Sequence, residues 1–146
     1  MHYEGAAEVE VPIDRLWDFL MDPEQVGRCI PGVQEVEAVE DGRQFRVKAL
    51  VDLGPMKPVL SLTVNITKAV KPTQARMTLR GKGAGSHIGA TSHIFLHEIE
   101  PQRTQLQWGF LLSVHGKIAT LGNRILDQVA QRTTRQFIAA LQQELS

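Results

Sequence analysis

The hydrophobic period of the sequence changes near its C-terminus. From Lys117 to Leu145, apolar residues recur every three or four positions, the spacing that places them on one face of an α-helix. This stripe consists of Ile118, Leu121, Ile125, Val129, Phe137, Leu141 and Leu145. A helix of roughly 28 residues is about 42 Å long at 1.5 Å per residue. Because that length exceeds one flat face of a small sheet, a sheet that buries the stripe has to curl around the helix.

Most of the chain before this helix alternates apolar and polar residues, which is typical of half-buried strands. Seven strands are predicted, at residues 3–11, 33–40, 43–53, 60–67, 75–80, 91–100 and 104–115. Asp41-Gly42 favours a hairpin turn between the second and third strands, because both residues tolerate positive φ. The glycine-rich residues 81–85 predict a flexible bend before the sixth strand.

Two short helices interrupt the strands early. Pro12 suits the start of a helix, and the apolar residues that follow it up to Leu20 are spaced three to four apart. Asp22-Pro23-Glu24 begins a second helix, which Ile30-Pro31-Gly32 ends. The predicted class is therefore α+β with a helix-grip fold, in which a curved seven-stranded antiparallel sheet surrounds a long C-terminal helix. We expect a single ligand-binding domain over residues 1–146.

Charge and cysteine content exclude several classes of protein. Sixteen basic residues balance sixteen acidic ones, so no overall positive field favours nucleic acid as a partner. Cys29 is the only cysteine, which excludes an intramolecular disulfide. No apolar run approaches the roughly 18 residues of a membrane span, and the N-terminal residues carry three glutamates where a signal peptide is basic and apolar. These features predict a cytoplasmic protein without an intrinsic membrane span.

Several motifs occur in a fairly specific order over nearly the whole chain. They are Pro12 to Leu20 followed by Asp22-Pro23-Glu24, then Ile30-Pro31-Gly32, Gly54-Pro55, Gly81-Lys82-Gly83-Ala84-Gly85 and the run from Gly116 to Asp127. In these motifs the sequence resembles the carbon monoxide dehydrogenase CoxG family, a branch of the superfamily that contains START lipid-transfer domains, polyketide cyclases and pollen-allergen-like proteins.

The resemblance implies an accessory protein of a molybdenum-hydroxylase or carbon monoxide dehydrogenase-type redox enzyme. It also implies an apolar cavity with a lipid or quinone as cargo, and allows a peripheral position at the inner face of the membrane. Some members of the family continue into a C-terminal membrane-anchoring segment. The sequence ends at Ser146 without one, so an anchor is not carried over.

The leading hypothesis is a noncatalytic binding module for an apolar small molecule. Inward strand residues would line its pocket and residues of the long helix would roof it, with burial of apolar ligand surface supplying the affinity. The predicted ligand-binding residues are Val51, Leu62, Val64, Met77, Leu79, Phe95, His97, Trp108, Phe110, Leu121, Ile125 and Val129. We assign no catalytic residue, metal ligand or cofactor.

Two other functions stay open. A cyclase- or hydrolase-like enzyme could use the same cavity, with His93 or His97 and Asp52 or Glu98 as candidate groups. Alternatively, a fully packed interaction module could aid maturation or membrane recruitment of a redox enzyme. The cavity volume distinguishes the module from the carrier, whereas two titratable groups converging in the cavity would favour the enzyme.

Four motifs have both a functional and an ordinary interpretation. The glycines at 81, 83 and 85 lack the Gly-Lys-Ser/Thr of a phosphate loop. His93 and His97 would suit a metal on a helix, but on a strand their Cα atoms lie about 13 Å apart. Cys29 has no evident base, which favours a small apolar filler. Asp14 and Asp18, at helical spacing beside Arg15, are interpreted as solvated charges.

Two groups of basic residues could form a surface for an acidic partner. One lies on a single strand face and the other on the last helix; they are Arg76, Arg80 and Lys82, and Arg124, Arg132 and Arg135. Scattered basic residues on a neutral protein are more often solvated surface.

Overall fold

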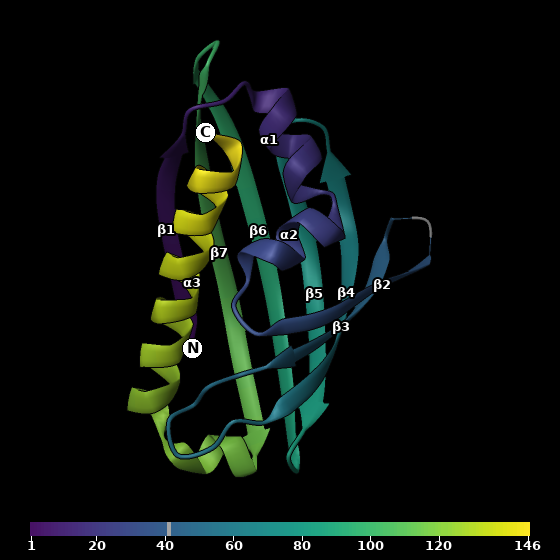
Figure 1. Cartoon of the computed structure of the whole chain (residues 1–146), viewed down its shortest axis with the longest axis vertical. Helices are drawn as coiled ribbons and strands as arrows, with labels where there is room; N and C mark the ends of the chain where they lie inside the picture. Colours follow the sequence, from purple (N-terminus) through teal and green to yellow (C-terminus); the bar gives the residue numbers. More distant parts are fainter. Residues whose placement is uncertain (41) are drawn as a thin grey trace.

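The computed structural model describes residues 1–40 and 42–146 and confirms the helix-grip fold (Figure 1). The elements follow the chain as β1 (His2–Val9), α1 (Ile13–Leu20), α2 (Pro23–Cys29), β2 (Val33–Glu40), β3 (Gln44–Leu50), β4 (Val59–Val70), β5 (Gln74–Gly83), β6 (Ser86–Glu100), β7 (Arg103–Gly116), the 3₁₀-helix η1 (Lys117–Leu121) and α3 (Asn123–Leu145). Asp41 of the predicted hairpin turn lies outside the described residues.

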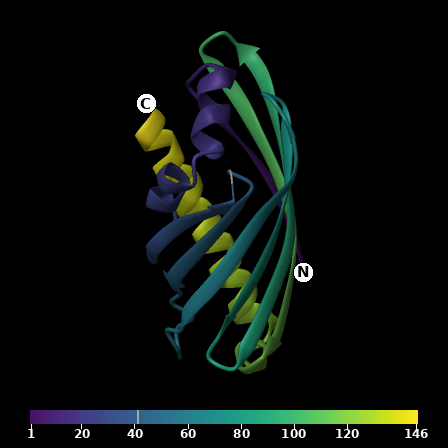
Figure 2. The same cartoon turned by 90° about the vertical axis from the view of Figure 1, so that its right-hand side faces the viewer.

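The seven described strands form one antiparallel sheet in the order β1-β7-β6-β5-β4-β3-β2. The two short helices carry the chain from β1, at one edge, to β2, at the other. The sheet curves, and α1, α2 and α3 all lie on its concave side (Figure 2). This arrangement leaves the opposite face of the sheet, the outer face, free of helices.

The long helix begins later than the sequence predicts. Residues 117–121 form η1, and Gly122 has a φ of 89°, which interrupts the helix before Asn123. The break changes which side chains face the sheet, because a 3₁₀ turn has three residues and an α turn 3.6. As a result Leu126 is buried at 7% exposure, whereas Ile125 is only half-buried. Ile118, Leu141 and Leu145 are buried as predicted.

Two hydrophobic clusters fill the space between the sheet and the helices. The α1 cluster joins α1 to β1, β6, β7 and the end of α3, and its most buried members include Leu16, Leu96 and Leu141. The η1 cluster joins η1 and the start of α3 to the β3–β4 connection through Leu53, Leu60, Ile118 and Leu126. The two ends of the long helix are therefore held by different sets of contacts.

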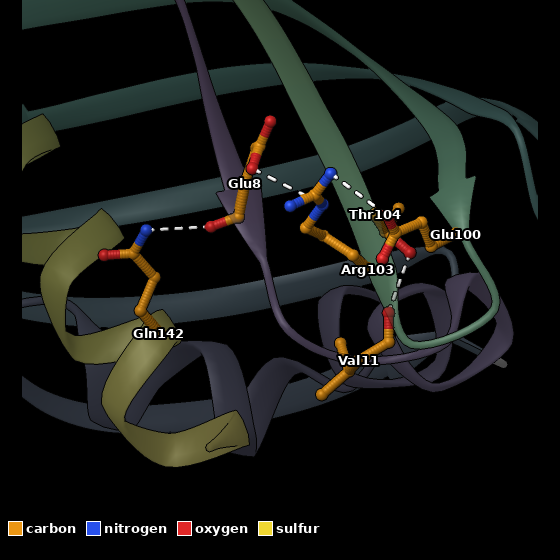
Figure 3. Close-up of polar contacts among 6 residues, drawn as sticks. All are labelled: Glu8, Val11, Glu100, Arg103, Thr104 and Gln142. Atoms are coloured by element: carbon orange, nitrogen blue, oxygen red, sulfur yellow. Dashed lines mark hydrogen bonds and ion pairs between the residues drawn. The ribbon is translucent and has the colours of Figure 1, made fainter.

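Polar contacts reinforce the end of the molecule around the α1 cluster (Figure 3). The buried hydroxyl of Thr104 donates to the carbonyl oxygen of Val11 at 2.9 Å, which joins β7 to the segment after β1. The side-chain amide of Gln142 donates to the carbonyl oxygen of Glu8 at 2.9 Å and so ties α3 to β1. These bonds hold the last turns of α3 over the sheet.

Candidate functional site

An apolar cavity of about 270 Å³ lies between the sheet and all three α-helices. Its lining comes from the concave faces of β5, β6 and β7, from α1, from α2 and the residue that follows it, and from the middle of α3. The lining residues are Leu20, Val26, Ile30, Met77, Ser92, Ile94, Leu106, Trp108, Phe110, Thr133, Thr134, Phe137 and Ile138. The cavity borders the α1 cluster, to which Ile94, Leu106 and Phe137 also belong.

Strand register directs the sheet residues into the cavity. Met77, Ser92 and Phe110 lie opposite one another on β5, β6 and β7, and Ile94 and Trp108 form the next pair. Side chains at directly opposite positions project from the same face of a sheet. Gly5 on β1 faces Trp108, and a Cβ atom at Gly5 would lie 2.4 Å from the indole ring. The absence of a side chain at Gly5 thus lets the Trp108 ring lie against β1.

The short helix α2 supplies Val26 and Ile30, and Asp22 fixes where it begins. One carboxylate oxygen of Asp22 accepts from the backbone amides of Glu24 at 3.1 Å and Gln25 at 3.4 Å. The Gln25 side chain donates to the other oxygen at 2.7 Å. This last bond is the largest of the interactions that lower the pKa of Asp22, so the carboxylate stays charged as the helix cap requires.

The polar groups of the cavity are three hydroxyls. Thr134 donates its hydroxyl to the carbonyl oxygen of Ala130 at 2.8 Å, one turn earlier in α3. Within the described residues, the hydroxyls of Ser92 and Thr133 make no hydrogen bond to protein atoms. They come from opposite walls, β6 and α3, and are available to a carbonyl or hydroxyl group of a ligand.

Tyr3 forms the nearest ionisable contact behind this lining. Its ring stacks on Phe110 with the ring centroids 5.0 Å apart, and its hydroxyl donates to Oδ1 of Asp127 on α3. Burial raises the pKa of Tyr3 to about 12, and the hydrogen bond to Asp127 and its negative charge act in the same direction. The pair ties the edge strand β1 to α3 and is neutral at the tyrosine up to high pH.

The Tyr3 contact predicts a loss of stability in alkali. Between pH 10 and 12 the unfolded chain releases the tyrosine proton while the folded chain retains it. The stabilisation is therefore complete below pH 10 and declines as the pH rises through 12. We expect the urea midpoint of the wild type to fall further between pH 9 and pH 11.5 than that of Tyr3→Phe. Equal falls for the two proteins would show that Tyr3 titrates normally.

The structure brings three of the predicted site residues together. Met77, Trp108 and Phe110 line the cavity. Val64 and Leu79 lie opposite each other on the concave face, outside the lining. Four other predicted residues pack instead into the η1 cluster, namely Val51, Leu62, Leu121 and Val129. Ile125 is half-buried on α3.

Phe95 and His97 lie on the outer face, so the inward direction that would place them in the cavity is not observed. Their neighbours Ile94 and Leu96 take the inward positions on β6, with exposures of 8% and 2%. His97 contacts the side-chain oxygen of Gln107 at 3.2 Å, and the His93 ring lies 5.4 Å from that of Phe95.

The groups considered for catalysis do not meet in the cavity. The Asp52 carboxylate accepts from the backbone amide of Gly54 at 2.9 Å in the β3–β4 connection, and Glu98 is exposed. In residues 1–40 and 42–146, no three His, Cys, Asp or Glu side chains are grouped as a metal ion requires. Cys29 is buried beside α3, and desolvation raises the pKa of its thiol, with the charge of Glu144 adding to the shift.

Sequence reasoning missed most of the helical side of the cavity. Ser92, Ile94 and Leu106 follow from the same alternation that identifies Trp108, once the inward face of β6 is known. Leu20, Phe137 and Ile138 belong to apolar helical stripes that also fill the core, so periodicity alone does not separate lining from packing. Nothing in the sequence distinguishes Thr133 from an ordinary surface threonine.

Fold and cavity together define a START- or cyclase-like helix-grip protein with a hydrophobic cavity suited to ligand binding. The model of the carbon monoxide dehydrogenase CoxG family matches residues 5–146, and the chain belongs to this family. The predicted resemblance is thus confirmed. A comparison with curated proteins gives no match.

Solved structures share the fold at low sequence identity. A conserved protein from Geobacillus kaustophilus is 24% identical with a TM-score of 0.92, and the match covers 99% of this chain and 95% of that one. A START superfamily protein from Mycobacterium smegmatis is 13% identical, with a TM-score of 0.75 and coverage of 99% and 96%. The Zhui aromatase/cyclase from Streptomyces sp. R1128 is 19% identical, with a TM-score of 0.70 and coverage of 99% and 93%.

None of the helices in the described residues is both long and apolar enough to cross a membrane.

Proposed function

We propose that this protein is a noncatalytic carrier that binds a lipid or quinone in the cavity between β5–β7 and the helices. The observation that carries the proposal is the cavity itself, which is apolar and has two hydroxyls free to bind a ligand, Ser92 and Thr133. Family membership supports a role as an accessory of a carbon monoxide dehydrogenase or a related molybdenum hydroxylase. In this role the protein would hold the apolar cargo away from water.

The size of the cavity favours a ring system or a short bent chain. An engineered cavity of about 150 Å³ binds benzene, so 270 Å³ suits roughly two fused rings. A cargo that buries about 300 Å² of apolar surface gains roughly 7 kcal/mol before the costs of association. Ser92 and Thr133 would each donate a hydrogen bond to a cargo oxygen, and these bonds would set the orientation of the cargo.

The chemistry of the lining favours a carrier over the two alternatives. Among the described residues, the side chains that line the cavity include no acid, base or histidine. General acid–base chemistry would need such a group within hydrogen-bond reach of the substrate. The cavity volume, for its part, argues against a module whose core is fully packed. We therefore prefer carriage of a cargo to catalysis or to a purely structural role.

Quenching of tryptophan fluorescence provides the test. A soluble naphthoquinone should quench Trp108, which lines the cavity, in a saturable manner. Trp17 is buried in the α1 cluster at 4% exposure, so Trp17→Phe should retain the saturable component and Trp108→Phe should lose it. Native mass spectrometry followed by organic extraction would identify a co-purified cargo. Quenching without saturation, together with no co-purified cargo, would contradict the proposal.

A further inference from the structure

A second hollow, of about 550 Å³, lies on the outer face of the sheet across β2 to β6. We call it the outer groove. Two adjacent rows of opposed residues cross it. The first row runs Glu35, Lys48, Ser61 and Lys82 from β2 to β5, and the second runs Glu37, Arg46, Thr63 and Arg80. Each row therefore has the order acid, base, hydroxyl, base.

The two rows leave a positive strip at their centre. Glu35 lies directly opposite Lys48 and Glu37 opposite Arg46, so these cations face a compensating charge on the neighbouring strand. Lys82 and Arg80 instead face Ser61 and Thr63. All four cations are exposed, and none of them takes part in the ion pairs found among the described residues. The charge that lacks a partner lies over the two hydroxyls.

The spacing of the rows matches an extended peptide. Residues two apart on one strand face are about 7 Å apart, since each residue advances the strand by 3.2–3.4 Å. Two carboxylates at alternate positions of an extended segment have the same separation and would each meet one row. Bonds from Lys82, Arg80 and the hydroxyls of Ser61 and Thr63 would then be charge-assisted at the acceptor.

The remaining features favour a protein segment over a uniform polyanion. A nucleic-acid backbone or an anionic membrane would bring negative charge against Glu35 and Glu37 as well as against the cations. Arg80 also borders a second hollow, of about 310 Å³, beside the apolar side chain of Leu111, which is 58% exposed. A peptide that leaves the charged strip in this direction would meet an apolar contact.

We propose that the outer groove docks an extended acidic segment of a partner protein, with Asp or Glu at alternate positions. Lys82 and Arg80 are its anchoring cations, and Glu35 and Glu37 exclude uniform polyanions. The site lies on the face of the sheet opposite the cavity, so this proposal does not depend on the cargo. It gives the chain two separate surfaces, one for a cargo and one for a partner.

The test uses two peptides of identical composition, one alternating glutamate and threonine over eight residues and one with four glutamates followed by four threonines. In NMR titrations of the intact ¹⁵N-labelled protein at 50 mM NaCl, the alternating peptide should shift the amides of Ser61, Thr63, Arg80 and Lys82. It should bind at least threefold more tightly than the block peptide. Both affinities should weaken at 300 mM NaCl, because added salt screens exposed charges.

Variants that change charge separate the groove from general electrostatics. Arg80→Gln/Lys82→Gln should weaken the alternating peptide roughly tenfold, given that exposed ion pairs contribute 0.2–1 kcal/mol each. Lys68→Gln/Arg76→Gln removes the same charge from an opposed pair on β4 and β5 that does not line the groove, and should change the affinity less than twofold.

Three results would overturn the proposal. They are equal weakening by the two double variants, absence of shifts at millimolar peptide, and tighter binding of the wild type to phosphatidylglycerol vesicles or oligo-dT than to the alternating peptide. Glu35→Gln/Glu37→Gln should gain binding to vesicles and oligo-dT, and failure to gain it would show that the glutamates do not select the partner.

Discussion

Thr133→Phe should abolish saturable quinone binding while leaving the protein folded. Thr133 projects from α3 into the cavity, and a phenyl ring there would occupy more than half of the 270 Å³, because benzene fits in about 150 Å³. We expect the dissociation constant to rise at least thirtyfold. Thr and Phe have similar helix propensities, and the added ring gains apolar contacts, so the Tm should stay within a few degrees of the wild type. Fluorescence titration and thermal unfolding measure the two effects.

A matched substitution on the same helix provides the control. Gln131 is exposed on α3, and Gln131→Phe should leave quinone binding unchanged. Leu62→Trp, which sequence reasoning favours as a cavity-filling change, should not block binding because Leu62 packs in the η1 cluster and against Gly81. If Thr133→Phe binds the quinone as tightly as the wild type, the cavity is not the binding site.

Leu126→Asp should cause the largest loss of stability in the first half of α3. Leu126 is 7% exposed in the η1 cluster, and a buried carboxylate there would lack a partner or would have to take up a proton. We expect the free energy of unfolding to fall by more than about 3 kcal/mol in urea titrations. Gln128→Asp, at an exposed position two residues later, should change it by less than about 0.5 kcal/mol.

The neighbouring position decides between two descriptions of the helix. Ile125→Asp should be milder than Leu126→Asp, since Ile125 is only half-buried. A greater loss with Ile125→Asp would mean that the helix continues from Lys117 with the predicted apolar stripe. Gly122, with its positive φ, makes that arrangement unfavourable.

The fold followed from the sequence because alternation and helical periodicity report which side of an element is apolar. That reasoning correctly placed Leu62, Val64, Met77, Leu79, Trp108 and Phe110 on the concave face. It failed on β6, where both faces contain apolar residues. Ile94 and Leu96 point inward only because they are paired with Trp108 and Leu106 on β7. Phe95 and His97 consequently point outward.

The extent of the cavity could not be predicted in the same way. Leu62 and Val129 point toward the interior, but η1 and the β3–β4 connection fill the space in front of them with Ile118 and Leu53. Periodicity gives the direction of a side chain and contains no information on what a connection fills. The opposite half stays open because α2 and α3 meet the sheet through Val26 and Phe137 without closing the gap.

The position of the cavity beside the α1 cluster makes a bound molecule a component of the folding core. Ile94, Leu106 and Phe137 belong to that cluster and also line the cavity, so a ligand would complete packing contacts that the empty chain lacks. A ligand present at a hundred times its dissociation constant stabilises the folded state by about 2.7 kcal/mol. Emptied chains would then open, and be degraded by proteases that cut opened chains, about a hundredfold more often than loaded ones. Turnover of the protein would thereby track the supply of its cargo.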